Sequence, residues 1–260
     1  MAYLVKISYF FKTNPQVTKA RSMQLGTSEN IRLLSIKKNQ WLAGLIDGDG
    51  CFLLSKKGYA SLEITMDIRD SICLYKIKNI YGGSIKMRSG NNSIRYRLHH
   101  KKGLFNLIND INGEIRSSNR IMQLIKICNK YNIIFKYPKP LTYSNNWLSG
   151  LFDADGTIII NKTNLELSIS ISQKNTQLLE PLINIFSGYI YIDRSSNTFK
   201  WYLTKKEDIL YLLDYLKSYP CYSLKKNRLF LISQFYQLKE LKHIPDFKKI
   251  FDNFFEKWDR

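Results

Sequence analysis

Residues 41–50 of this 260-residue chain read WLAGLIDGDG, and residues 147–156 read WLSGLFDADG. In both stretches the apolar residues recur at the three- and four-residue spacing of a short helix that buries one face. Two acids separated by one small residue follow, and a glycine that is expected to end the helix closes each stretch. One copy fits an ordinary helix end equally well, but two copies 106 positions apart indicate an internal duplication.

Small residues recur within each copy. Gly44 and Gly48 stand four positions apart on one helical face, as do Gly150 and Ala154. Small side chains at this spacing let two helix backbones approach closely, a geometry best known from membrane helices. We therefore expect the two motif helices to pack side by side, with their C-terminal ends together.

Each motif ends in acids, Asp47 and Asp49 in the first and Asp153 and Asp155 in the second. A helix C-terminus carries partial negative charge, so carboxylates are unfavourable there, and convergence of two such ends adds repulsion. A divalent cation would relieve it, because hard cations such as Mg²⁺ bind carboxylates, backbone carbonyls and substrate phosphates. The paired motifs therefore predict a metal site at the junction of two helices.

Residues 42–50 and 148–156 resemble the two signature motifs of the LAGLIDADG homing endonucleases, in the single-chain form that carries both. The departures are Gly48 for alanine in the first motif, and Ser149 and Phe152 in the second. The resemblance implies an α+β fold of two pseudo-symmetric αββαββα repeats. In this fold the antiparallel sheets form a saddle that holds DNA.

The resemblance also implies roles inside the motifs. Asp49 and Asp155 would be the metal ligands, with Mg²⁺ or Mn²⁺ as the cation, whereas Asp47 and Asp153 would serve mainly helix-end structure. The backbone carbonyls that would help to hold the metal belong to Gly48 and Ala154. Such a site would hydrolyse one phosphodiester in each strand and, as in the family, leave short 3′ overhangs.

Peripheral groups that order water and phosphate are expected by the same resemblance. Gln173 lies just past a predicted strand, and its aligned partner in the first repeat is Ile68. Lys225 and Arg116 open the last helix of each repeat and are the candidate basic groups, although ordinary basic helix starts account for them equally well. The missing glutamine at Ile68 predicts two chemically unequal half-sites.

The rest of the chain follows the duplication. Alternating apolar and polar residues predict antiparallel hairpins after each motif, because a strand places successive side chains on opposite faces. In the first repeat we expect strands at 51–57, 60–68, 84–88 and 94–99, and helices at 70–81, 101–112 and 117–131. In the second, residues 164–188 align without a gap to 59–83, residues 198–204 align to 93–99, and helices follow at 205–217 and 221–241.

These patterns divide the chain into five segments. They are an N-terminal basic arm (1–34), the first repeat (35–135), a proline-containing linker (136–146), the second repeat (147–241) and a C-terminal amphipathic helix (242–260). The aromatic residues of the last segment are expected to pack on the body as core. A targeting segment or the remnant of an upstream reading frame is an alternative for the arm.

Composition restricts the partner. Lys and Arg number 40 against 21 acids, a net charge of +19, which favours a polyanion such as nucleic acid. A ribosomal or membrane-surface protein would also be basic, and charge alone excludes neither. No apolar run reaches the ~20 residues of a membrane span. Four scattered cysteines argue against zinc and disulfide frameworks. The abundance of Lys, Asn, Ile and Tyr is typical of AT-rich organellar genomes and favours a mitochondrial location.

The polar faces of the predicted strands supply the expected DNA contacts. Two sheets side by side would present one concave basic surface, and a two-stranded ribbon can enter the major groove. Long basic side chains would reach bases and phosphates, and short hydroxyls would bind through water. The expected contacts are Lys57, Ser61, Glu63, Thr65, Lys86, Arg88, Arg95, Arg97, Asn161, Ser168, Ser170, Lys200 and Tyr202. A solvated sheet face is the alternative for each of them.

Together these patterns predict a monomeric, metal-dependent endonuclease that cuts double-stranded DNA at a long site. The site should be asymmetric, because the reading residues differ between the repeats, with Arg97 aligned to Tyr202. Two alternatives stay open: a maturase that binds intron RNA and assists splicing, and a DNA-binding module that does not cut. Retention of both motif acids favours cleavage, but a maturase could keep them too.

Overall fold

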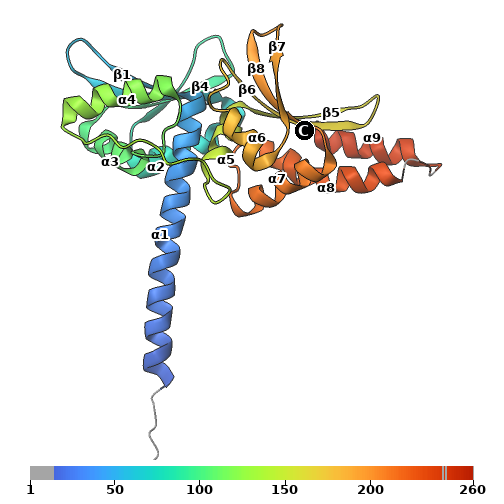
Figure 1. Cartoon of the computed structure of the whole chain (residues 1–260), viewed down its shortest axis with the longest axis horizontal. Coiled ribbons are helices and arrows are strands. Elements are labelled where there is room, and N and C mark those ends of the chain that lie inside the picture. Colours follow the sequence, from blue (N-terminus) through green and yellow to red (C-terminus); the bar gives the residue numbers. More distant parts are fainter. Residues whose placement is uncertain (1–14, 242, 244, 260) are drawn as a thin grey trace, which may run out of the picture. The chain divides into compact units, whose positions relative to one another are not determined.

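The structure is a computed structural model that describes residues 15–241, 243 and 245–259, with side-chain surroundings from residue 29 onward (Figure 1). It divides into two compact units, Met1–Ile36 and Lys37–Arg260. The predicted basic arm lies outside the described residues up to position 14. Within the described residues, every helix is too short or too polar to span a bilayer.

The first repeat carries a four-stranded antiparallel sheet in the order β1-β2-β4-β3. The strands are β1 (Gly50–Leu54), β2 (Ala60–Asp67), β3 (Ser84–Met87) and β4 (Ser93–Leu98). The turn η1 (Ile68–Asp70) and the helices α2 (Ser71–Tyr81), α3 (Lys101–Ile111) and α4 (Ser118–Tyr131) complete it. Alternate strand residues such as Leu62, Ile64 and Tyr96 are buried, so one face of the sheet belongs to the core.

The second repeat has the same plan, with the strand order β5-β6-β8-β7 (Figure 1). The strands are β5 (Gly156–Asn161), β6 (Glu166–Gln173), β7 (Tyr189–Asp193) and β8 (Thr198–Leu203). The helices are α5 (Trp147–Asp155), α6 (Glu180–Phe186), α7 (Lys206–Ser218), α8 (Lys225–Glu240) and α9 (Phe247–Trp258). Ile169, Ile171 and Trp201 are buried on the inner face. The predicted α+β fold with two repeats is confirmed.

The first motif lies at the end of a long helix. Helix α1 (Pro15–Asp49) has 35 residues, whereas α5 has nine. The expectation of a short helix is therefore wrong for the first motif, and the boundary drawn at residues 34 and 35 falls inside α1. Proline is favoured in the first turn of a helix, and no proline follows Pro15 before the helix ends, so nothing interrupts it.

The motif helices pack backbone to backbone, as the small residues predicted. A Cβ built on Gly44 would lie 1.9 Å from the carbonyl oxygen of Trp147, and one built on Gly150 would lie 1.9 Å from that of Trp41. Real Cβ atoms do not approach this closely. The two equal distances show that the contact is nearly symmetric.

The glycines that close the motifs end the two helices, as predicted. Gly156 has φ −71° and ψ 145°, an extended conformation open to any residue. A Cβ there would lie 2.5 Å from the carbonyl oxygen of Phe152, and a Cβ on Gly50 would lie 2.8 Å from that of Ile46. Glycine is required because the chain turns from helix into strand against its own last turn.

Strand pairing corrects the alignment of the two repeats. Gly50 pairs with Ile64 across β1 and β2, whereas Gly156 pairs with Ile171 across β5 and β6. Equivalent residues of β2 and β6 are thus 107 positions apart, not the 105 of a gapless alignment. A shift of two residues leaves every side chain on its original face, so the polar pattern alone could not reveal it.

The C-terminal helix packs as predicted. Phe251, Phe254 and Trp258 of α9 are buried, and the ring of Phe235 on α8 lies 6.1 Å from that of Phe254. The apolar stripe of this amphipathic helix therefore belongs to the core of the second repeat.

Candidate active site and nucleic-acid interface

Two reciprocal hydrogen bonds fasten the motif helices together. The indole Nε1 of Trp147 donates to Asp47 Oδ2 at 2.8 Å, and that of Trp41 donates to Asp153 Oδ2 at 2.8 Å. Each carboxylate also accepts two backbone N–H groups from its own repeat. Asp47 accepts those of Arg116 and Ser117, just before α4, and Asp153 accepts those of Tyr222 and Ser223, just before α8. Both acids are buried, and burial raises the pKa of Asp47 to about 6. These two acids hold the repeats together.

The other two acids converge at the helix ends. A Cβ built on Gly48 would lie 2.4 Å from Ala154 Cβ and 2.6 Å from Asp155 Oδ2, so the two C-termini touch. Burial raises the pKa of Asp49 to about 7, and the negative charge of Asp155 is the second cause. Burial also raises the pKa of Asp155. A positive charge near the two carboxylates would therefore stabilise their ionised forms.

Two basic side chains approach this junction from opposite repeats. Lys225, the first residue of α8, donates from Nζ to the carbonyl oxygens of the last residues of α5, at 2.6 Å to Asp153 and 3.0 Å to Ala154. Arg120, in the first turn of α4, donates from Nη2 to the carbonyl oxygen of Gly48 at 3.4 Å. Both cations lower the pKa of Asp49 and of Asp155 against the effect of burial. They cap the helix ends whose exposed carbonyls repel the acids.

Arg116 does not reach this junction, contrary to the role considered for it. Its Nη1 donates to the carbonyl oxygen of Lys139 at 2.7 Å, and its guanidinium lies 5.6 Å from the centre of the Trp147 ring. The backbone of Arg116 is already bound to Asp47, which fixes its side chain on the linker side. Arg120, one helical turn further on, takes the position that was considered for Arg116 as the basic residue at the start of the helix.

The two acids have unequal partners. Gln173 Nε2 donates to Asp155 Oδ2 at 2.7 Å, whereas within the described residues no side chain hydrogen-bonds to the Asp49 carboxylate. With the corrected register, the counterpart of Gln173 is Met66, which is buried, and not Ile68. The inequality between the half-sites therefore arises on the inner face of the sheet.

The donor set at the junction suits a hard divalent cation. Asp49 and Asp155 supply carboxylate oxygens, and the carbonyls of Gly48 and Ala154 keep a second lone pair beyond the one that each basic side chain uses. The described residues hold no cluster of three or more His, Cys, Asp or Glu side chains, so protein side chains alone would not complete a coordination sphere. Phosphate oxygens and water would supply the remaining ligands.

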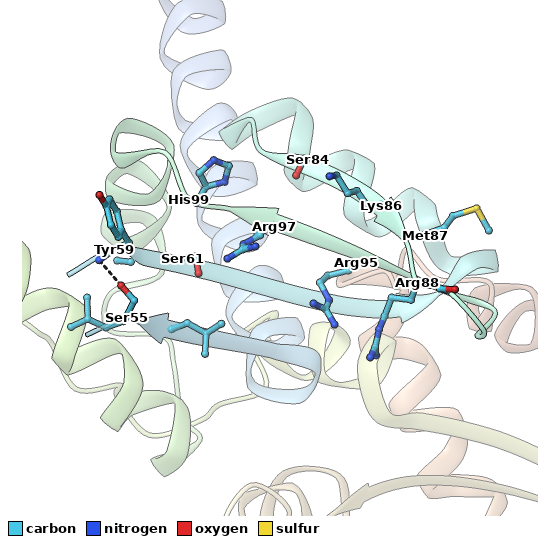
Figure 2. Close-up of a pocket in the computed structure, with 14 residues that line it drawn as sticks. Ser55, Tyr59, Ser61, Ser84, Lys86, Met87, Arg88, Arg95, Arg97 and His99 are labelled. Carbon is cyan, nitrogen blue, oxygen red and sulfur yellow. Dashed lines mark hydrogen bonds between the residues drawn. The ribbon is translucent and has the colours of Figure 1, made fainter. Parts of the chain in front are cut away.

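The outer face of the first sheet is strongly basic, and the acid Glu63 lies among its arginines. Glu63 on β2 forms ion pairs with both arginines of β4, at 3.2 Å to Arg95 Nη1 and 3.2 Å to Arg97 Nε. Across the next pair of strands, Lys86 stands opposite Arg95. Figure 2 shows Arg95 and Arg97 on the inner strand β4 and Lys86 on the neighbouring edge strand β3.

A groove of about 1030 Å³ runs over this face. Five of the predicted DNA contacts line it, namely Ser61, Lys86, Arg88, Arg95 and Arg97 (Figure 2). Glu63 and Thr65 occupy alternate positions of β2 on the same face, and Lys57 lies in the turn between β1 and β2. The groove therefore joins most of the contacts predicted on the first sheet.

The outer face of the second sheet has a different character. The predicted contacts Asn161, Ser168, Ser170, Lys200 and Tyr202 lie on it at alternate strand positions. Lys200 forms an ion pair of 2.7 Å with Asp193, which offsets its charge. This face is therefore polar and aromatic, with little free charge.

Sequence reasoning missed several residues at these sites. Arg120 was detectable as a basic residue one helical turn after the segment that caps the first motif helix. Tyr189 and Tyr191 were detectable from their alternation with isoleucines along β7. Tyr59 lines the groove of the first sheet, just before a strand whose interior residues were predicted.

The family profile described as LAGLIDADG endonuclease matches residues 42–137 and 148–236. The two matched segments begin at the two motifs and cover most of both repeats.

Curated relatives carry two kinds of name. The chain is 43% identical over 268 residues to the "Intron-encoded RNA maturase bI4" of Saccharomyces cerevisiae, an alignment that covers 99% of this chain and 41% of the relative. It is 40% identical to the "Probable intron-encoded endonuclease aI2" of Debaryomyces hansenii, over 88% of this chain and 37% of the relative. It thus spans about two fifths of the length of these relatives. The "Intron-encoded DNA endonuclease ai2b" of Dictyostelium discoideum is 41% identical, with 80% of this chain and 83% of the relative covered.

Solved structures share the fold. The LAGLIDADG meganuclease I-AabMI bound to uncleaved DNA superposes with a TM-score of 0.62 at 21% identity, over 85% of this chain and 98% of that one. I-SmaMI, bound to an uncleaved DNA target in the presence of calcium ions, gives 0.60 at 18% identity, over 83% and 97%. At these identities the likeness concerns the arrangement of helices and sheets.

Proposed function

Because this chain belongs to the LAGLIDADG endonuclease family, we propose that it is a site-specific, metal-dependent endonuclease that cuts both strands of a long, asymmetric DNA site. The observation that carries the proposal is the convergence of Asp49 and Asp155 at the touching ends of two helices, each end capped by a basic side chain. The endonuclease names of several relatives and the DNA-bound structural neighbours support it.

The side chains and carbonyls at the junction of α1 and α5 would have different roles in the reaction. Asp49 and Asp155, with the carbonyls of Gly48 and Ala154, would hold Mg²⁺ or Mn²⁺. When bound, the cation neutralises charge on the phosphate and makes a bound water more acidic. Lys225 and Arg120 keep positive charge beside the acids and would attract the scissile phosphates. Gln173 fixes the orientation of the Asp155 carboxylate.

One pair of acids would serve both strands. Each motif supplies one acid of the pair, so a single chain provides the groups that a symmetric dimer would otherwise bring together, and we propose that it acts as a monomer. The products would carry short 3′ overhangs, as the family resemblance implies. The AT-rich codon bias reflected in the composition supports a mitochondrial location.

Cleavage of a DNA copy of the intronless host gene tests the function. Wild-type protein with Mg²⁺ should linearise such a plasmid, while Asp49→Asn and Asp155→Asn should each reduce the rate by at least about 100-fold and leave DNA binding intact, because each removes a carboxylate that would hold the metal. Asp252→Asn, an exposed acid on α9, is the matched control and should cut normally. Wild-type rates from both acid variants would exclude this site.

A second function is favoured by one observation. The relative aligned over 99% of this chain is named an RNA maturase, so assistance in splicing of an intron RNA is the alternative proposal. Binding and splicing assays with the host intron RNA would distinguish the two. An RNA that splices faster with the protein, together with no DNA cleavage under Mg²⁺ or Mn²⁺, would favour the maturase.

A further inference from the structure

The outer faces of the two sheets are built from different side chains at equivalent positions. On the second sheet, Tyr189 pairs with Tyr202 and Tyr191 pairs with Lys200 across β7 and β8. The equivalent pairs on the first sheet join Ser84 to Arg97 and Lys86 to Arg95. Aromatic rings thus replace the serine, the lysine and one of the arginines. The corrected register does not affect this comparison, because it concerns the other hairpins.

The three tyrosines form one cluster on the outer face. The ring centres of Tyr189 and Tyr191 lie 6.2 Å apart, and each lies 5.6 Å from that of Tyr202. Tyr189 is 50% exposed and Tyr191 is 36% exposed, so the rings are available to a partner. They are not core residues, because the alternate residues of β8, such as Trp201, fill the inner face.

Charge on this face is nearly balanced. Lys200, the lysine that lies beside the tyrosines on this face, forms an ion pair of 2.7 Å with Asp193, which neutralises its charge. Phosphate attraction is therefore weak here, and recognition must depend on apolar contact and hydroxyl hydrogen bonds. In the major groove the apolar feature of a base pair is the C5-methyl group of thymine.

The first sheet has the complementary chemistry. Glu63 binds Arg97 through Nε, and it binds Arg95 through one terminal nitrogen. Each arginine therefore keeps further N–H donors beyond the one that lies against Glu63. Such a held guanidinium matches the O6 and N7 acceptors of guanine, the commonest specific arginine contact with DNA. Glu63 thus acts as a positioning residue for the arginines.

We propose that the second sheet reads a thymine-rich half-site through contacts of Tyr189, Tyr191 and Tyr202 with thymine methyl groups, whereas the first sheet reads guanine through Arg95 and Arg97. This inference rests on the proposed endonuclease function and gives each half-site its base preference. Duplex DNA is favoured over a single strand because no two of the rings lie parallel around a slot for an unstacked base. Tyr202 meets the other two rings at 64° and 85°, and the rings of Tyr189 and Tyr191 are inclined at 41°.

Selection of binding sites from random DNA tests both the binding of duplex DNA and the base preference of each half-site. The full chain with the Asp155→Asn substitution is used to enrich duplexes from a random library in Ca²⁺, and each half of the selected site is then modified in turn. Uracil in place of thymine should weaken binding about three- to fourfold for each contacted methyl in the half read by the second sheet, the value of burying one such group. Uracil in the other half should have little effect, and 7-deazaguanine should have the reverse pattern.

Substitutions of the tyrosines test whether these residues cause the preference for thymine over uracil. Tyr189→Ser combined with Tyr202→Ser should abolish the difference between thymine and uracil, whereas Tyr202→Phe keeps the ring and should preserve it. Tyr75→Ser on α2, an equally exposed tyrosine away from the sheets, is the control and should bind as the wild type does. Retention of the thymine preference by the double variant would overturn the assignment.

The outcomes separate the inference from the function on which it rests. A selected duplex that is indifferent to methyl removal in both halves overturns the inference and leaves the endonuclease intact. Failure to enrich any duplex, or loss of RNA binding alone in the tyrosine variants, overturns both.

Discussion

Asp47 and Asp49 stand two positions apart on α1, and their carboxylates meet different partners. Asp47 accepts an indole N–H and two backbone N–H groups, which offset part of the cost of its burial. Asp49 receives no such hydrogen bond within the described residues and faces the charge of Asp155. At the scale of single residues, the motif therefore combines a structural acid with one whose ionisation is disfavoured until a cation arrives.

The raised pKa of Asp49 predicts how stability changes with pH. Its pKa is about 7 in the folded protein and near 3.8 in the unfolded chain, so the stabilisation by protonation is complete below pH 3.8 and is lost as pH rises through 7. Asp49→Asn should therefore raise the melting temperature at pH 8 by about 2–4 °C, the shift for roughly 1 kcal/mol in a protein of this size. The measurement is thermal unfolding in chelator.

The comparison with lower pH is the internal control. At pH 4.5, where wild-type Asp49 is largely protonated, the variant and the wild type should melt at closely similar temperatures. Mg²⁺ at pH 8 should stabilise the wild type more than the variant. An equal gain from the substitution at both pH values would show that the carboxylate charge is not the cause.

At the scale of elements, the paired helices α1 and α5 depend on backbone contact. The glycines at their crossing leave no room for a side chain, and the tryptophans reach across to the acids of the opposite helix. A helix pair in close contact holds its two ends at a fixed separation. The spacing of Asp49 and Asp155 is therefore a consequence of packing well away from the acids.

Gly44→Ala should disrupt this pair. The new Cβ would lie 1.9 Å from the carbonyl oxygen of Trp147, which is backbone and cannot move aside, so we expect destabilisation by about 3 kcal/mol or more. Chemical denaturation measures it. Gly90→Asn is the control, because this turn residue has φ +77°, nothing lies within 4 Å of its added Cβ, and asparagine tolerates that conformation. A change of less than about 1 kcal/mol for Gly44→Ala would contradict the close packing.

At the scale of the whole molecule, charge is distributed unevenly. The net charge is +19, yet on the outer face of the second sheet Lys200 is ion-paired with Asp193, while the groove of the first sheet is lined by Lys86, Arg88, Arg95 and Arg97. We infer that the first sheet supplies much of the attraction to phosphate and that the second contributes more of its recognition through shape and apolar contact.

Salt dependence checks this division. Each neutralised phosphate contributes about −0.9 to the slope of log affinity against log salt. Replacement of Lys57 and Lys86 by Gln should therefore make the slope shallower by up to about two, whereas Lys217→Gln on α7 should leave it nearly unchanged. Anisotropy titrations at several salt concentrations give the slopes. Equal effects of the two sets of substitutions would argue against the basic surface assigned here.

The choice of cation should separate binding from cutting. Ca²⁺ accepts looser geometry and more ligands than Mg²⁺, so we expect Ca²⁺ to support DNA binding and Mg²⁺ or Mn²⁺ to support cleavage. Gel assays of binding and cleavage with the same duplex measure both. Cleavage in chelator at the rate seen with Mg²⁺ would show that no metal takes part.

The sequence by itself determined the duplication, the α+β class, the strand faces and the paired acids. These features follow from local periodicity and from a motif repeated at a fixed distance, and both can be recognised from the amino-acid sequence alone. The glycines of the motif even predicted the backbone contact between its helices, because only one kind of packing requires small residues at that spacing.

Only the tertiary structure decided which basic residue meets the end of the first motif helix and how the two repeats correspond. Arg120 rather than Arg116 reaches the first motif because the backbone of Arg116 is engaged by Asp47. A two-residue shift of β6 against β2 preserves every face, so no pattern of polar and apolar residues distinguishes it. The length of α1 was likewise hidden, since nothing in the residues before the motif marks a boundary. Contacts between distant segments fix these features, and such contacts leave no periodic trace in the chain.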